Sequence, residues 1–252
     1  MKERVAVLNG RFDPLTLDET VDAVFAALRT GERGWLCTVN VATLITMRTN
    51  RKLQSFVDRS FLSVADGQPL VWCARLFGGC LPERVTGIDL VDALCRRAAA
   101  EGKNVYLLGS TPRLLAKALS RLRQRYPELL IDGADGYFSA EGAPARVDTI
   151  RARGVSLLLV GMGTPRQESF IEDHWDRLGV GLAMGVGGSF DVVAGARFRA
   201  RPWIGRVGME WVVRLVQEPR RLLPRYLTTN SMFCVLIAGV VVDRLKRWMT
   251  AR

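Results

Sequence analysis

The chain has 252 residues, of which 48% are hydrophobic and 24% are charged. This composition supports a full hydrophobic core and excludes a disordered or fibrous protein. The formal net charge is +11, and residues 197–252 contribute 12 basic against 3 acidic residues, or +9 of that total. The C-terminal quarter is therefore predicted to meet anions such as phosphate, nucleic acid or an acidic membrane surface.

The body of the sequence alternates between short apolar runs and segments with apolar residues at helical spacing. The predicted strands are residues 5–8, 35–40, 61–65, 105–108, 129–132, 155–161 and 181–186. The predicted helices are residues 18–28, 89–100, 112–126, 143–153 and 165–178. Such alternation predicts an α/β, Rossmann-like fold whose mainly parallel sheet has helices on both faces. Ligands of such sheets bind beyond the carboxyl ends of the strands.

The most informative segment reads Gly-Met-Gly-Thr-Pro-Arg-Gln-Glu and covers residues 161–168, directly after the apolar run 155–160. A buried strand that ends in a glycine turn and opens a helix presents backbone N–H groups at a positive dipole end, which suits phosphate. No third glycine stands at the spacing of the dinucleotide fingerprint. The segment favours a nucleotide or nucleotide-sugar site, with an ordinary strand-to-helix turn as the alternative.

Five further turns after predicted strands have the same polar, glycine- or proline-bearing composition, so we expect all six to line one cleft. The residues predicted to contact a nucleotide sugar there are Gly109, Ser110, Gly136, Tyr137, Phe138, Gly161, Gly163, Pro165, Gln167, Glu168, Gly187, Gly188 and Asp191.

Among carboxylates, Asp66 follows the predicted strand 61–65 and precedes a glycine, a rigid place from which a general base could reach a hydroxyl. The alternative is an N-cap for a helix that begins near Gln68. Asp89 is better explained as a carboxylate at a helix N-terminus. Arg84 suits either a diphosphate contact or a solvated surface. His174, the single histidine, is expected at a surface or half-buried position.

No Asp-x-Asp pair occurs in the sequence, so we expect no metal ion. The charge of a diphosphate would instead be met by arginines and helix N-termini.

The alternation stops near residues 195–202, which predicts an α/β catalytic domain over 1–196 and an Arg-rich helical appendage over 197–252. Arg214, Arg221 and Arg225 of the appendage are predicted to converge on a phosphate. The apolar run 232–242 has 11 residues, against about 20 for a membrane-spanning helix. We therefore expect it to lie at a membrane interface or to pack on the protein, with the basic residues after it touching anionic lipid.

Together the motifs resemble the WecG/TagA/CpsF family of bacterial glycosyltransferases over about residues 4–227. The resemblance rests on Thr-Val-Asn 38–40, Ala-Asp-Gly 65–67, Arg-Val-Thr-Gly-Ile-Asp-Leu 84–90, Leu-Gly 108–109, segment 161–168, Gly-Val-Gly-Gly-Ser-Phe-Asp 185–191, Glu-Trp 210–211, Arg214 and Glu-Pro-Arg-Arg 218–221.

The resemblance implies an inverting, metal-independent transfer of a sugar from a UDP-sugar to a polyprenyl-diphosphate-linked saccharide, at the inner face of the cytoplasmic membrane. The product would enter a bacterial exopolysaccharide or cell-wall polymer. It also implies Asp66 as the base, with Thr38 and Asn40 beside it, Gln167 near the sugar and Arg84 in the same pocket. The appendage, about residues 197–226, would close over the site and bring its arginines to the diphosphate.

Two features depart from the family pattern: the sequence Arg-Ala-Arg-Pro at 199–202 replaces the usual Arg-Ala-Pro, and the tail after Tyr226 is longer and more apolar. The residues do not select the donor sugar among N-acetylmannosamine, its uronic acid and a hexose such as glucose. They also do not determine whether the protein forms a homo-oligomer. Two other functions are weighed: a nucleic-acid-binding protein that uses the basic tail, and a non-catalytic nucleotide-binding module docked on a membrane. The glycine-rich cleft argues against nucleic acid as a partner.

Overall fold

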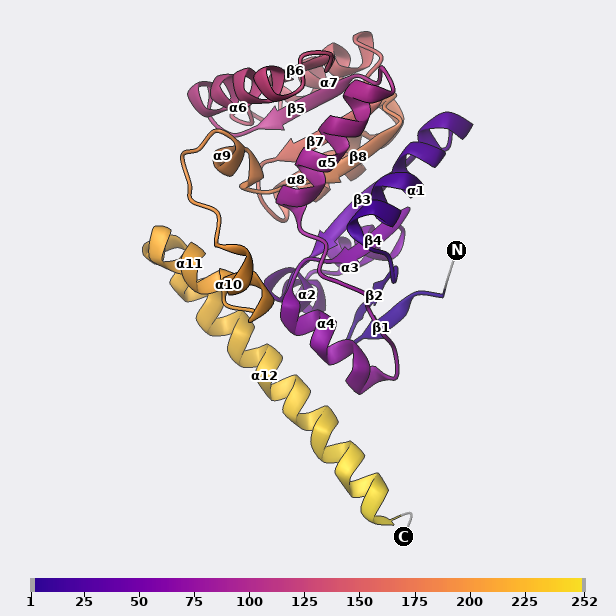
Figure 1. Ribbon diagram of the computed structural model, residues 1–252, viewed down its shortest axis with the longest axis vertical. Helices are drawn as coiled ribbons and strands as arrows, with labels where there is room; N and C mark the ends of the chain where they lie inside the picture. Colours follow the sequence, from indigo (N-terminus) through magenta and orange to yellow (C-terminus); the bar gives the residue numbers. More distant parts are fainter. Residues whose placement is uncertain (1–2, 251–252) are drawn as a thin grey trace.

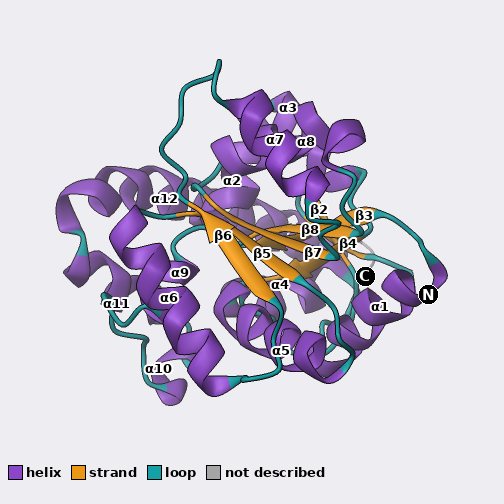
Figure 2. Cartoon of the chain, turned by 90° about the horizontal axis from the view of Figure 1, so that it is seen from above, coloured by secondary structure: helices purple, strands orange, loops and turns teal. Residues whose placement is uncertain are grey.

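The computed structural model describes residues 3–250, and its centre is a six-stranded sheet in which every neighbouring pair is parallel. In spatial order the strands are β4 (Leu62–Ala65), β3 (Gly34–Val39), β8 (Leu182–Gly185), β7 (Leu157–Gly161), β5 (Val105–Gly109) and β6 (Ile131–Ala134). Figure 2 shows helices above and below this sheet. The predicted α/β, Rossmann-like class is confirmed.

Both faces of the sheet are buried, which explains why the strands read as nearly continuous apolar runs. Along β5, Tyr106 and Leu108 join one hydrophobic cluster while Val105 and Leu107 join the other. One face is covered by α2 (Val41–Thr49), α3 (Arg51–Asp58), α7 (Ala143–Ala152) and α8 (Arg166–Leu178). The other is covered by α1 (Leu17–Thr30), α5 (Gly87–Ala100), α6 (Pro112–Arg125) and α9 (Ser189–Val193).

Two parts of the body differ from the sequence prediction. The run 5–8 forms no strand of the main sheet; β1 (Val5–Val7) pairs antiparallel with β2 (Gly10–Phe12) in a separate hairpin. Helices α2 and α3 were not predicted, and the short helices α4 (Gln68–Ala74) and η1 (Arg75–Phe77) follow β4. Helix α2 buries Ala42, Leu44, Ile45 and Met47 under neighbours on several sides, so its sequence lacks the one-sided apolar period of a surface helix.

After residue 196 the chain leaves the body, here residues 3–196, and forms the C-terminal region, residues 197–250. The region contains α10 (Pro202–Arg206), α11 (Glu210–Gln217) and the long α12 (Pro219–Thr250). In Figure 1, α12 starts beside α11, runs along α2 and projects beyond the body. Phe233 of α12 is buried in the hydrophobic cluster that contains Tyr106 and Leu108, and Leu236 and Ile237 pack against this cluster.

Helix α12 changes the interpretation of the apolar tail. The 11 residues of 232–242 belong to a 32-residue helix, and residues 226–242 carry no charge because Thr, Asn and Ser precede the apolar run. By length and composition alone, the segment Pro219–Lys246 is therefore long enough and apolar enough to cross a membrane. Only 11% of its most apolar stretch is buried in the protein. The expectation that the tail is too short to span a bilayer is wrong on length, although its inner face packs on the body.

Candidate active site

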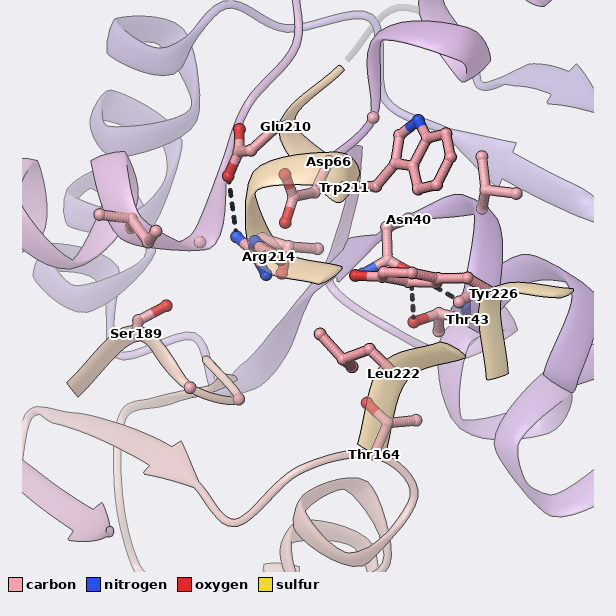
Figure 3. Close-up of a pocket in the computed structure, with 18 of the residues that line it drawn as sticks. Asn40, Thr43, Asp66, Thr164, Ser189, Glu210, Trp211, Arg214, Leu222 and Tyr226 are labelled. Atoms are coloured by element: carbon pink, nitrogen blue, oxygen red, sulfur yellow. Dashed lines mark hydrogen bonds and ion pairs between the residues drawn. The ribbon is translucent and has the colours of Figure 1, made fainter. Parts of the chain in front are cut away.

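A cleft of about 430 Å³ lies where the C-terminal region meets the carboxyl ends of β3, β4, β7 and β8. Its volume falls in the usual range of small-molecule sites. The body contributes the turns that hold Thr38, Asp66, Gly163 and Gly187, and the C-terminal region contributes one side of α11 and of α12. Figure 3 shows side chains from both parts converging on this space.

Asp66 stands at the end of β4, where its backbone N–H donates to the carbonyl of Val39 on the neighbouring strand. The N-cap alternative fails, because Gly67 is the N-cap of α4 and no side chain caps that helix. Burial raises the pKa of Asp66 to about 7, opposed by the charges of Arg214 and Arg84 and reinforced by that of Glu210. The carboxyl group is thus poised near neutrality.

Thr38 and Asn40, from the end of β3, line the cleft beside Asp66. Asn40 also caps α2: its Oδ1 accepts the backbone N–H of Thr43 at 2.9 Å and the Thr43 hydroxyl at 3.2 Å. Within residues 3–250 the Asn40 Nδ2 group and the Thr38 hydroxyl form no hydrogen bond, so both are available to a ligand.

Positive charge dominates the cleft. Its described lining contains three carboxylates, Asp66, Glu210 and Glu218, against six arginines: Arg84, Arg197, Arg199, Arg214, Arg221 and Arg225. Such an excess of guanidinium groups suits a ligand with several negative oxygens.

Glu210 bridges two of these arginines. Its Oε2 lies 2.5 Å from Nη1 of Arg84 and its Oε1 lies 3.0 Å from Nη2 of Arg214. Arg84 is only 17% exposed, so it is not the solvated surface residue that the sequence also allowed. Although burial raises the pKa of Glu210, the charges of Arg214 and Arg84 hold that pKa below its usual value. Glu210 is therefore an anion at neutral pH.

Glu218 bridges a second pair in the same way, with Oε1 2.8 Å from Arg197 and Oε2 2.5 Å from Arg221. Arg225 differs from the other five, because no carboxylate among the described residues lies within ion-pair distance of it. It is half-buried and lines the cleft, and the Glu168 carboxylate acts on its charge only from beyond ion-pair distance.

Asp89 stands in the first turn of α5, as expected for a carboxylate at a helix N-terminus, while Thr86 is the N-cap. One Asp89 oxygen accepts the Thr86 hydroxyl at 2.6 Å and the other lies 2.5 Å from Arg199. Asp89 therefore joins α5 to the C-terminal region rather than facing the cleft as a base. His174 is half-buried against Phe170, also as expected.

Gln167, only 4% exposed, ties two glycine turns together. Its Oε1 accepts the backbone N–H groups of Gly163 at 3.2 Å and Gly187 at 2.9 Å, and its Nε2 donates to Glu168 Oε1 at 2.8 Å. A side chain at Gly185 would clash, because its Cβ would lie 2.5 Å from Gln167 Nε2. Gln167 lines the cleft, but most of its hydrogen-bonding capacity is used to hold the two turns.

Backbone N–H groups at the start of α8 are already hydrogen-bonded within the protein, which the glycine turn in the sequence did not indicate. The backbone N–H of Gly163 donates to Gln167 Oε1. The N–H of Gln167 donates to the Gly163 carbonyl, and the N–H of Ser169 donates to the Pro165 carbonyl. Gly163 and Gln167 line the cleft, whereas Gly161, Pro165 and Glu168 do not. The turn thus shapes the cleft wall, and these N–H groups are not free for phosphate.

The expectation that six turns share one cleft holds for four of them. The residues outside the described lining are Gly109, Ser110, Gly136, Tyr137, Phe138, Gly161, Pro165, Glu168 and Asp191. The turns after β5 and β6 are displaced because these strands stand at the far edge of the sheet from β3 and β4. They remain linked to the cleft, since Asp191 accepts the Ser110 hydroxyl at 2.7 Å and lies 2.9 Å from Arg197. Gly187 and Gly188 do line the cleft.

Sequence reasoning placed Arg214, Arg221 and Arg225 correctly in the cleft but missed Arg197, Arg199 and the two bridging glutamates. The spacing of Glu210 to Arg214 and of Glu218 to Arg221 is the i,i+4 and i,i+3 pattern of helical ion pairs, which was available as a signal. In residues 3–250, no group of three or more His, Cys, Asp or Glu side chains is placed to hold a metal ion.

The fold and the cleft together define an α/β protein with a ligand site at the carboxyl edge of its sheet. A family model described as "Glycosyl transferase WecG/TagA/CpsF family" matches residues 5–248. The chain therefore belongs to this family, and it is an enzyme, a glycosyltransferase.

Proposed function

We propose that this glycosyltransferase moves a sugar from a UDP-sugar to a hydroxyl group of a polyprenyl-diphosphate-linked saccharide, with inversion at the anomeric carbon and with Asp66 as the base. The observation that supports this most strongly is Asp66 itself, a half-buried carboxyl group with a pKa of about 7 in a cleft that six arginines line. A base poised near the working pH and a cationic site for a diphosphate are the two parts that such a transfer needs.

In the proposed reaction, Asp66 takes the proton of the acceptor hydroxyl while that oxygen attacks the anomeric carbon. The bond between this carbon and the diphosphate oxygen breaks, and UDP leaves with the electron pair. A single displacement on the opposite face inverts the configuration. Thr38 and Asn40 have free polar groups with which to orient the reacting partners.

The leaving diphosphate would be stabilised by arginines. Arg225 forms no ion pair with a carboxylate among the described residues, and Arg214 and Arg221 stand on the same wall of the cleft. Fixed guanidinium groups aimed at developing charge can take the place of a divalent ion in this step. On this basis we propose that the reaction needs no metal.

The acceptor's lipid carrier would be met at the membrane. Helix α12 packs on α2 through Phe233 and its neighbours, while many of its exposed side chains are apolar. These exposed side chains include Leu223, Leu227, Val235, Val242 and Met249. Because basic residues follow Asp243, we propose that α12 attaches the enzyme to the cytoplasmic face of an anionic membrane.

The proposal is tested by a product assay on the full-length enzyme. UDP-N-acetylmannosamine, its uronic acid and UDP-glucose are offered in turn, with a polyprenyl-diphosphate-linked saccharide as acceptor. Transfer from one of them that is lost in Asp66→Asn supports the proposal. Binding of UDP without transfer from any donor would favour a non-catalytic nucleotide-binding module.

Calorimetry separates the remaining alternative. We expect UDP to bind and a single-stranded oligonucleotide not to compete with it, because five of the six cleft arginines are already held in ion pairs at the cleft rather than spread along an open groove. Tight oligonucleotide binding without UDP binding would identify a nucleic-acid-binding protein instead.

A further inference from the structure

Asp66 lacks an ion pair in a place where two arginines could supply one. Within residues 3–250, no arginine or lysine nitrogen lies within 4.0 Å of its carboxylate, although Arg84 and Arg214 line the same cleft and act on its charge. Figure 3 shows Asp66 beside Arg214 and Glu210. A guanidinium that reached Asp66 would form a charge-assisted pair and occupy the oxygen lone pairs that must receive the acceptor proton.

Both guanidinium groups are held by another carboxylate. Glu210 offers Oε2 to Arg84 and Oε1 to Arg214, so each arginine has a partner other than Asp66. We propose that Glu210 is a positioning residue that holds Arg84 and Arg214 away from Asp66 and so keeps the Asp66 carboxylate free to act as a base. The proposal rests on the assignment of Asp66 as the base, made above.

The arrangement has a consequence for the two parts of the molecule. Asp66 and Arg84 belong to the body, whereas Glu210 and Arg214 arrive on α11. If only Arg214 came with the C-terminal region, docking would add a second cation next to the base and weaken it. Because Glu210 comes with it, docking brings a cation toward the leaving group without pairing the base.

The groups that act on the Asp66 carboxyl group come from two sides. Arg84 and the backbone N–H of Gly87 belong to the body, and Arg214 and Glu210 belong to α11. The remaining ionisable groups of the described cleft lining are Arg197, Arg199, Glu218, Arg221, Arg225, Tyr226 and Cys234. Glu218 is a matched control, because it also bridges two arginines and is similarly exposed, 23% against 16% for Glu210, but does not act on Asp66.

The test measures the Asp66 carboxyl group directly. Full-length protein in detergent, labelled with ¹³C at the aspartate carboxyl carbon, is titrated by NMR, and Asp66→Asn identifies the Asp66 signal. We expect a wild-type midpoint near pH 7. Glu210→Gln should lower it by about one pH unit or more, because two arginines are released toward Asp66. Glu218→Gln should leave it unchanged.

A charge-balanced double variant, Arg84→Gln with Glu210→Gln, separates two effects of Glu210. One is that it holds Arg214 away from Asp66, and the other is its own negative charge near Asp66. The double variant removes one cation and one anion but frees Arg214, so the proposal predicts a midpoint below that of the wild type. An unchanged midpoint in folded Glu210→Gln, or a wild-type midpoint in the double variant, would overturn the proposal. The titration needs neither donor nor acceptor, so its result is independent of the product assay. The titration tests the role of Glu210, and the product assay tests the proposed sugar transfer.

Discussion

The body and the C-terminal region bury their apolar residues very differently. The body closes two hydrophobic clusters around a sheet that is covered on both faces. In the C-terminal region only Leu222 and Phe233 are buried hydrophobic side chains among those described. Conversely, of the large hydrophobic side chains that are exposed in the described residues, all but Trp72, Leu130 and Tyr137 lie at or after Phe198. One part is stabilised by its own core, and the other presents apolar surface outward.

Ion pairs at the cleft join the two parts. Arg84 to Glu210, Arg199 to Asp89 and Arg197 to Asp191 each connect a residue of the body with one of the C-terminal region. Partly exposed pairs of this kind are individually weak and are screened by salt. The body is therefore stabilised by its own core, whereas the C-terminal region is attached to it by the packing of α12 on α2 and by ion pairs at the cleft.

The largest effect is expected from the body, at the base. Asp66→Asn keeps the shape of the side chain but cannot accept a proton, so turnover should fall about 100-fold to 10,000-fold, while UDP affinity measured by calorimetry stays within a few fold. Asp148→Asn, at an exposed carboxylate of α7, is the control and should be fully active. Near wild-type turnover of Asp66→Asn would exclude Asp66 as the base.

The next effect concerns membrane attachment by the C-terminal region. A truncation that starts before Phe233 would remove a buried side chain, so the cut is placed after Gly239, beyond Ile237, the last residue packed on the core among those described. This truncation removes Arg244, Lys246 and Arg247, each contributing about 1 kcal/mol toward anionic lipid, which corresponds to roughly 100-fold weaker liposome binding.

Turnover of the truncated enzyme on a soluble acceptor analogue should be unchanged, because the whole of the described cleft lining is retained. Vesicles of neutral lipid serve as the control, since they should discriminate much less between the two proteins. Equal binding of the truncated and full-length enzymes to anionic vesicles would contradict the proposed role of the tail.

Single arginines on the cleft wall should have a smaller effect. Arg225→Ala removes a cation that forms no ion pair among the described residues, and the loss of one charge-assisted phosphate contact costs about 1.5 to 3 kcal/mol, or roughly 10-fold to 100-fold in kcat/KM. Arg214→Ala and Arg221→Ala should also lower it, even with a soluble acceptor. Arg220, next to Arg221 but outside the cleft lining, is the matched control. Full activity of all three alanine variants would refute the diphosphate role.

The pH dependence should follow the raised pKa of Asp66. Because the base must be deprotonated to act, kcat/KM should fall as the pH drops below about 7, by about tenfold for each pH unit. The acid limb is measured with saturating acceptor between pH 5 and pH 8. A flat profile across this range would show that no group with this pKa controls the reaction.

The smallest change is expected on chelation. We predict that EDTA leaves turnover within experimental error, because the arginines of both parts supply the positive charge. Loss of activity with EDTA and recovery with Mg²⁺ or Mn²⁺ would show that these arginines do not suffice.

The strands of the main sheet, the five longest helices of the body and the polar turns could be predicted from the sequence, because these depend on local periodicity and on the residue types that follow a strand. Asp66, Thr38, Asn40 and Gln167 could be placed at the edge of the sheet for that reason. The hairpin of β1 and β2 and the buried helix α2 were not predicted. Short strands, and a helix with neighbours on several sides, show no clear periodicity of apolar residues in the sequence.

Which of these turns share the cleft depends on the order of the strands in the sheet. The strand order β4-β3-β8-β7-β5-β6 places the turns after β5 and β6 away from Asp66, and no local pattern encodes that order. The same holds for the contacts of Glu210, which joins Arg84 across 126 positions of the chain. Local sequence fixes each helix and each charge, but the pairing of charges from distant segments depends on how those helices dock, and docking is set by packing of the whole chain.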